Sequence, residues 1–141
     1  SDCVIDPDSI LLYSTFQKSY AFSNCHNGPR AYDNNWGTFA DGVSDCDVNV
    51  SYNLPPEPLI NAFSEQRADN NNQAGIDIYC YDYTTLNMIR ILSIESIYTN
   101  ITIPNNCLIN SPLVLNYKLL EAGTTVPEFF EQKMWWNVSI A

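Results

Sequence analysis

Residues 76–83, Ile-Asp-Ile-Tyr-Cys-Tyr-Asp-Tyr, decide the fold class of this chain. Tyrosines occupy three of the alternate positions, and the positions between them hold Ile76, Ile78, Cys80 and Asp82. Successive side chains of a β-strand point to opposite faces, so this alternation predicts a strand with one largely apolar face and one face of tyrosine rings. The tyrosine face is either the edge of a core or a platform for a ligand.

The same alternation surrounds three N-glycosylation sequons, which begin at Asn49, Asn100 and Asn137. A sequon is an Asn, a residue other than proline, and a Ser or Thr, and it is typical of surface positions in secreted proteins. The neighbours of each Asn in the opposite phase are mostly apolar, as Val48 and Val50 are beside Asn49. We therefore predict that all three Asn side chains face solvent and carry N-linked glycans, and that the protein is secreted.

Other segments add β-prone sequence on both sides of these motifs. Within residues 88–103 the apolar side chains shift from even to odd positions. Such a shift predicts a bulge or a bend that passes the chain from one sheet to another. Further strands are expected at residues 9–16, 20–23, 48–52, 113–120 and 135–140.

Leu59–Arg67 is the best helical candidate. Pro58 suits the first turn of a helix, and one helical face would hold Leu59, Ala62, Phe63 and Gln66. Residues 127–133 are expected to form one helical turn or an irregular link, and residues 30–47 are loop-like.

These patterns together predict one domain that spans residues 1–141. A chain of 141 residues, 45% of them hydrophobic, is long enough to bury a core. The expected fold is all-β, a single antiparallel β-sandwich of about seven to nine strands with at most one or two short helices.

The charge of the chain excludes several partners. Its 16 Asp and Glu residues exceed its 6 Lys and Arg residues, the net charge is −10, and the cations are scattered singly. Nucleic acid and anionic membrane surfaces require clustered cations, so neither is an expected partner. The longest apolar stretches are shorter than the ~20 residues of a membrane-spanning helix, so no membrane insertion is expected.

The five cysteines are widely spaced and form none of the CxxC pairs that are typical of zinc sites. In an oxidising compartment, two bridges and one remaining cysteine are expected. We favour Cys25–Cys46 and Cys80–Cys107, because each pair closes a local excursion between predicted strands. Cys3 then remains as a free buried thiol, as half of an intermolecular bridge, or as a member of a different intramolecular pairing.

The sequence contains no catalytic constellation, and we expect neither an enzyme nor a cofactor. His26 is the single histidine, so Ser-His-Asp and Cys-His mechanisms would both depend on it. A weak calcium candidate is the acidic loop at residues 41–47, where Asp41, Asp45 and Asp47 offer carboxylate oxygens. The alternative is a solvated loop without a metal.

Trp135 and Trp136 are adjacent, so only one of them can face the core from a terminal strand. The outward ring is covered by a partner, by the glycan of Asn137 or by a loop of the same chain.

The sequence therefore favours a structural or adhesive subunit that associates with copies of itself or with another extracellular protein. We expect residues 9–16 or 135–140 to complete the sheet of a neighbouring copy and so build an oligomer or fibre. The interface residues would be Ile10, Leu12, Trp135 and Trp136. The alternative is a monomeric secreted module that binds carbohydrate or a host protein through Tyr and Trp side chains.

Overall fold

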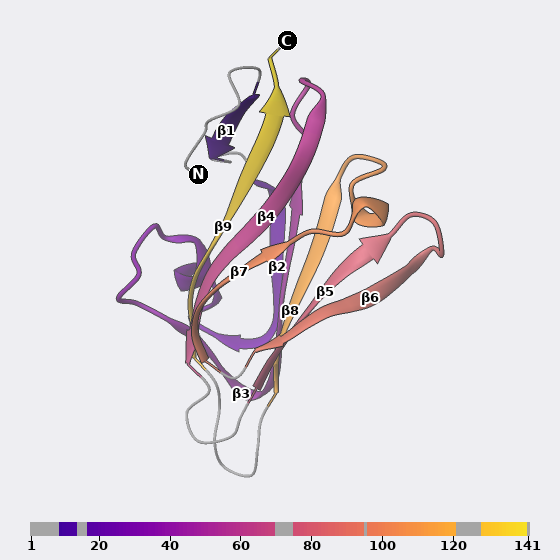
Figure 1. Ribbon diagram of the computed structural model, residues 1–141. Helices are drawn as coiled ribbons and strands as arrows, with labels where there is room; N and C mark the ends of the chain where they lie inside the picture. Colours follow the sequence, from indigo (N-terminus) through magenta and orange to yellow (C-terminus); the bar gives the residue numbers. More distant parts are fainter. Residues whose placement is uncertain (1–8, 14–16, 70–74, 95, 121–127, 141) are drawn as a thin grey trace.

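The computed structural model describes residues 9–13, 17–69, 75–94, 96–120 and 128–140 (Figure 1). This part of the chain is built from β-strands with two short 3-10 turns, η1 at Gly28–Tyr32 and η2 at Asn105–Cys107. The strands are β1 Ser9–Tyr13, β2 Gln17–His26, β3 Ala40–Tyr52, β4 Leu59–Asp69, β5 Gly75–Asp82, β6 Asn87–Ile94, β7 Ser96–Thr102, β8 Leu113–Leu120 and β9 Glu128–Ser139.

The strands form two antiparallel sheets packed face to face. The first sheet has the order β2-β3-β8-β5-β6, and the second has the order β1-β9-β4-β7. The two sheets are joined at one corner, where Ala40 and Asp41 at the start of β3 pair with Phe129 and Glu128 of β9. The fold is therefore the antiparallel β-sandwich that the sequence predicts.

The phase change within residues 88–103 marks the passage between the sheets. β6 pairs with β5 in the first sheet, and β7 pairs with β4 in the second sheet. The chain therefore changes sheets between Ile94 and Ser96, as the shift from even to odd apolar positions predicts. Figure 1 shows the two strands diverging from this point.

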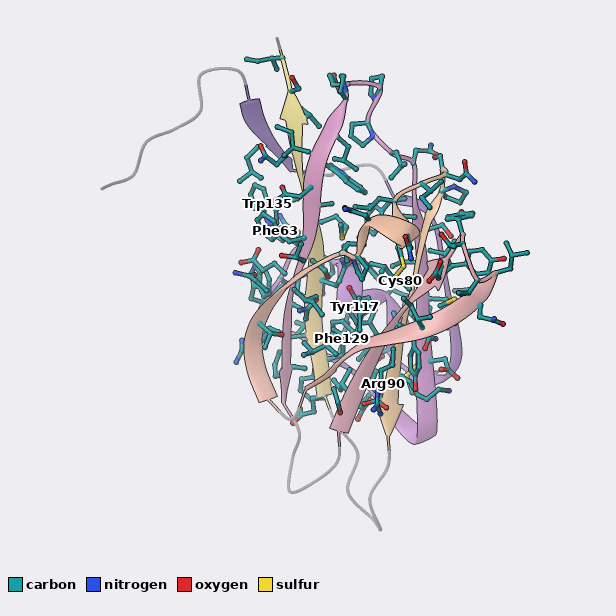
Figure 2. All side chains as sticks on the ribbon, turned by 45° about the vertical axis from the view of Figure 1, so that its right-hand side comes forward. Phe63, Cys80, Arg90, Tyr117, Phe129 and Trp135 are labelled. Carbon is teal, nitrogen blue, oxygen red and sulfur yellow. A yellow bond between two sulfur atoms is a disulfide. The ribbon has the colours of Figure 1, made fainter. Side chains whose placement is uncertain are left out.

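The core lies between the sheets and consists of alternate side chains from both. Tyr117 of the first sheet and Phe129 of the second meet edge to face, with ring centroids 4.9 Å apart (Figure 2). The alternation of residues 76–83 and 48–52 is confirmed, because one phase of each strand is buried. The buried residues of β3, β5 and β8 include Val48, Val50, Tyr52, Ile76, Ile78, Cys80, Asp82, Leu113, Leu115 and Leu119.

The helix expected at residues 59–67 is wrong, because this segment is strand β4. Its inward positions hold Ala62, Ser64, Gln66 and Ala68, all buried. These side chains are small or polar, so the strand shows no period-two pattern of hydrophobicity. The larger Phe63 lies on the outer face and gave the segment its apparent helical spacing.

The extent of two other strands also differs from expectation. β3 begins at Ala40, inside the segment predicted to be loop-like, and β9 begins at Glu128, inside the predicted link. Asp41–Asp47 is therefore strand and not a free acidic loop. The pairing with β2 is irregular here, since Ser23 pairs with Asp47 and Cys25 with Gly42.

Two disulfides reinforce the first sheet. Cys25 of β2 is bonded to Cys46 of β3, with Cα atoms 4.9 Å apart. Cys80 of β5 is bonded to Cys107 of η2, with Cα atoms 6.1 Å apart. Both are the pairings that the sequence favours, and each loop closure is worth about 3 kcal/mol in the chain-entropy model. Cys3 lies outside the described residues.

The described residues of both segments expected to be donated to a neighbour lie in the sheet of their own chain. β1 pairs with β9 along its full length, from Ser9 opposite Ser139 to Tyr13 opposite Trp135. β9 also pairs with β4 on its other side. Donation of either strand would remove it from these ladders, so the pairing of β1 and β9 does not support strand donation.

Candidate functional site

A groove lies on the outer face of the first sheet. Its volume is about 470 Å³, within the range of small-ligand sites. Strands β3, β5, β6 and β8 all contribute to it. The lining side chains are Asp47, Asn49, Tyr79, Met88, Val114, Asn116 and Lys118.

The strand register sets these side chains in rows across the sheet. Asn116 of β8 lies between Asn49 of β3 and Tyr79 of β5, and Tyr79 in turn pairs with Arg90 of β6. The neighbouring row places Lys118 between Asp47 and Asp77. Every second residue of a strand faces the same side, so the inward alternation of the core fixes these outward rows.

Hydrogen bonds hold the polar side of the groove in one arrangement. Asn116 Nδ2 donates to Asn49 Oδ1 at 2.7 Å and to Asp47 Oδ1 at 3.2 Å. Lys118 Nζ donates to the same Asp47 oxygen at 2.8 Å. Strands β3 and β8 thus present a connected set of amide, carboxylate and ammonium groups.

The charged side chains in the groove form one ion pair, and those of Arg90 and Asp77 beside it form another. Lys118 is paired with Asp47, and Arg90 lies 3.9 Å from Asp77. The Arg90 side chain is 60% exposed whereas that of Asp77 is 8% exposed, so the cation remains open to solvent. Figure 2 shows Arg90 on β6, the edge strand of this sheet. The groove therefore carries little net charge in a chain of net charge −10.

The tyrosines of β5 lie on this outer face and are half-buried. Tyr79 lines the groove beside Met88. Tyr81 and Tyr83 contact each other edge to face, with ring centroids 4.9 Å apart. The Tyr83 hydroxyl donates to the carbonyl of Pro112. Tyr79 is therefore the tyrosine that lines the groove, and the other two pack against each other.

The two adjacent tryptophans face opposite sides of the second sheet. Trp136 is 3% exposed and meets Tyr52 in the core, so its expected place at an interface is wrong. Trp135 lies on the outer face, stacked on Phe63 (Figure 2) and donating to Glu65 Oε1 at 3.2 Å. The outward ring is thus packed by its own chain. The other expected interface side chains, Ile10 and Leu12, lie outside the described part.

The three sequons lie on strands, on the outer faces of the two sheets. Asn49 is half-buried on β3 of the first sheet. Asn100 of β7 is exposed and pairs with Glu65, and Asn137 of β9 is half-buried between Leu11 and Asn61. The structure therefore orients all three away from the core, and their glycosylation remains a prediction.

A carboxyl pair lies away from the groove. Glu131 of β9 is buried, and its Oε1 accepts a hydrogen bond from the backbone N–H of Asn35 at 3.2 Å. Burial, followed by a hydrogen bond to Asp33, raises the pKa of Glu131 to about 8. Asp33 also accepts from the Thr38 hydroxyl. Sequence reasoning missed this pair because its members lie far apart in the chain.

The calcium candidate receives a different environment from the one expected. Asp47 is paired with Lys118, and Asp41 lies where β3 meets β9. The side chain of Asp45 lies outside the described part. Across the described residues there is no group of three or more His, Cys, Asp and Glu side chains that could hold a metal ion. The backbone of His26 pairs with that of Asp41 at the end of β2.

No family model matches the chain, and no curated protein is similar to it in sequence. Several solved structures are similar in fold. A pectin-binding carbohydrate-binding module is 10% identical with a TM-score of 0.51, covering 84% of this chain and 90% of that chain. The lectin domain of lectinolysin, complexed with Lewis b antigen, is 11% identical with a TM-score of 0.53, covering 83% and 91%.

The family 32 carbohydrate-binding module of C. perfringens NanJ, in complex with galactose, is 10% identical with a TM-score of 0.51 and covers 83% of this chain and 92% of that chain. At such low identity the likeness shows the fold alone. The chain is therefore similar to a class of β-sandwiches that includes carbohydrate-binding modules and lectin domains. In the described residues, no helix is long and apolar enough to cross a membrane.

Proposed function

We propose that this chain is a non-catalytic, saccharide-binding module of an extracellular protein, and that the groove on the first sheet is its binding site. The observation that carries the proposal is the row of Asn49, Asn116 and Tyr79 across three strands. The likeness to carbohydrate-binding modules supports the class, and the location of the site rests on this chain's own residues.

A saccharide has hydroxyl groups, which both donate and accept hydrogen bonds, and it has apolar ring faces made of C–H groups. The groove offers carboxylate and amide oxygens that accept, and an amide and an ammonium group that donate. Tyr79 adds an aromatic surface with a polar tip, the kind of side chain that stacks on an apolar ring face. Because the hydrogen bonds of Asn116 already orient the polar groups, binding does not have to order them.

The matched charges of the groove favour a neutral saccharide. Lys118 and Arg90 each have an aspartate partner, so neither offers an unopposed cation to a carboxylated sugar. The net charge of −10 would also repel a polyanion at long range. A neutral oligosaccharide needs no unopposed cation and is not repelled by the net negative charge.

The proposal also includes an extracellular location and a single folded domain. Disulfides persist in oxidising compartments, and the described residues form two, Cys25–Cys46 and Cys80–Cys107. The sequons are consistent with passage through the same compartment. Strands from both ends of the sequence, β1 and β9, pair with each other, as expected if the chain folds as one domain.

A glycan array tests the proposal. Unglycosylated protein should bind a neutral oligosaccharide on an array that includes galactose and Lewis b antigen. Lys118→Ala should weaken this binding about tenfold, or about 1.4 kcal/mol. Lys133→Ala is the matched control, because Lys133 lies on β9 of the other sheet. Binding to no printed glycan, or equal losses in both variants, would remove the proposed site.

Self-association remains a second candidate, supported by exposed apolar side chains beside Asn137. Leu11 pairs with Asn137 across the ladder, and Ile60 lies at an adjacent bulge. Both side chains are 49% exposed. Light scattering of the native protein, with and without reductant, distinguishes self-association from a monomeric binding module. A constant monomer mass would exclude self-association.

A further inference from the structure

One residue belongs to both the groove and a modification motif. Asn49 lines the groove, and Asn49-Val50-Ser51 is a sequon. Val50 is buried in the core, so the strand must present Asn49 on the outer face. A glycan on this residue and a ligand in the groove would therefore start from the same place.

The orientation of the Asn49 amide follows from its hydrogen bond. Oδ1 accepts from Asn116 Nδ2 at 2.7 Å, which directs this oxygen toward β8. Among the described residues, no acceptor is bonded to Asn49 Nδ2, the atom that carries an N-linked glycan. The amide is thus held by its oxygen, and the side chain as a whole lines the groove.

We propose that an N-linked glycan on Asn49 closes the groove, so that glycosylation of this residue and binding of a free saccharide exclude each other. The proposal rests on the proposed function. A glycan on Asn49 starts from a side chain that lines the space of about 470 Å³ that a ligand would occupy. The sequon then divides the protein into an unmodified form that binds and a modified form that does not.

The modification is a group transfer from a lipid-diphosphate-linked oligosaccharide. A bond forms between Asn49 Nδ2 and the anomeric carbon of the first sugar, and the bond from that carbon to the diphosphate oxygen breaks. The lipid diphosphate leaves with the electron pair of the broken bond, and Nδ2 loses one of its two protons to solvent.

The other two sequons provide internal controls. Asn100 and Asn137 lie on β7 and β9 of the second sheet, whereas the groove is on the outer face of the first. The core separates these faces. Glycans at these two positions should therefore leave the groove open.

The experiment compares three proteins secreted from a glycosylating host. Ser51→Ala removes the sequon and keeps Asn49 itself, and Ser51 is not among the residues that line the groove. Ser139→Ala removes the sequon of Asn137 in the same way. Peptide mapping measures glycan occupancy, and titration with the best neutral glycan from the array measures affinity, with unglycosylated wild type as the reference.

We expect Ser51→Ala to bind like the unglycosylated reference. Wild type occupied at Asn49, and Ser139→Ala likewise occupied there, should bind at least tenfold more weakly. Equal affinity of the occupied wild type and Ser51→Ala would overturn the closure of the groove while leaving the binding module intact, as would a fully unoccupied Asn49 in the secreted wild type. No binding by the unglycosylated reference would instead refute the proposed function.

Discussion

The hydroxyl oxygen of Tyr117 on the first sheet lies 2.6 Å from that of Ser64 on the second. Ser64 donates its one proton to Gln66 Oε1 at 2.6 Å, so Tyr117 is the donor of the pair. Ser64 also accepts from Gln132 Nε2 at 3.2 Å. Burial raises the pKa of Tyr117, which keeps its proton in place. This network joins the sheets through polar groups in the core.

Loss of Ser64 should cost more stability than loss of the Tyr117 hydroxyl. Tyr117→Phe removes one hydrogen bond, an expected loss of about 1 kcal/mol in the free energy of unfolding. Ser64→Ala leaves three buried groups without their partner, and an unsatisfied group costs about 1–3 kcal/mol. Urea unfolding of both variants measures the two losses in the free energy of unfolding. A smaller loss for Ser64→Ala than for Tyr117→Phe would contradict the network.

The same network explains where sequence reasoning failed. Ser64 and Gln66 occupy inward positions of β4, where a hydrophobic residue is the usual choice. The partners of Ser64 include Tyr117 of β8 and Gln132 of β9, more than fifty residues away, and Gln66 donates to Thr99 of β7. A buried polar side chain whose hydrogen-bond partner is distant in sequence does not show in a pattern of hydrophobicity. The sequence of β4 therefore predicts a helix in place of a strand.

Glu131 should make stability decrease as the pH rises. Its pKa in the folded protein is about 8, well above the ordinary glutamate pKa of 4.5, because burial and Asp33 disfavour the charged form. The contribution of this group is therefore fully present below pH 4.5 and is lost as the pH rises through 8.

Glu131→Gln should remove this part of the pH dependence. A shift of one pKa unit corresponds to about 1.4 kcal/mol. Above pH 8 the free energy of unfolding of the variant should therefore exceed that of wild type by more than this amount. Melting curves from pH 5 to about 9 in EDTA compare the two, since the chelator prevents a cation from replacing the proton between the carboxyl groups. Parallel curves would refute the raised pKa.

The groove was only partly visible in the sequence. The alternation of residues 76–83 predicts the tyrosine face that includes Tyr79, and the Asn49 sequon predicts an outward amide. The role of Asn116 was missed, although Val114, Asn116 and Lys118 are the outward phase of a predicted strand. What the sequence lacks is the register that sets Asn116 between Asn49 and Tyr79.

Asn116→Ala should affect binding more than folding. The side chain is half-buried and its bonds lie at the surface, so we expect less than about 1 kcal/mol of lost stability. The loss of orientation at Asn49 and Asp47 should weaken binding about tenfold. Asn100→Ala, on the opposite face, is the matched control, and titration and melting curves are measured on both. Normal affinity of Asn116→Ala would contradict the role of the polar row.

The central claim is that saccharide binds at Tyr79 on the first sheet. Calorimetric titration of unglycosylated wild type, Tyr79→Ala and Tyr79→Phe with the best neutral glycan from the array tests it most directly. We predict at least a tenfold loss of affinity for Tyr79→Ala, about 1.4 kcal/mol, and a smaller loss for Tyr79→Phe, which keeps the ring. A Tyr79→Ala variant that remains folded and binds as tightly as wild type would contradict the account.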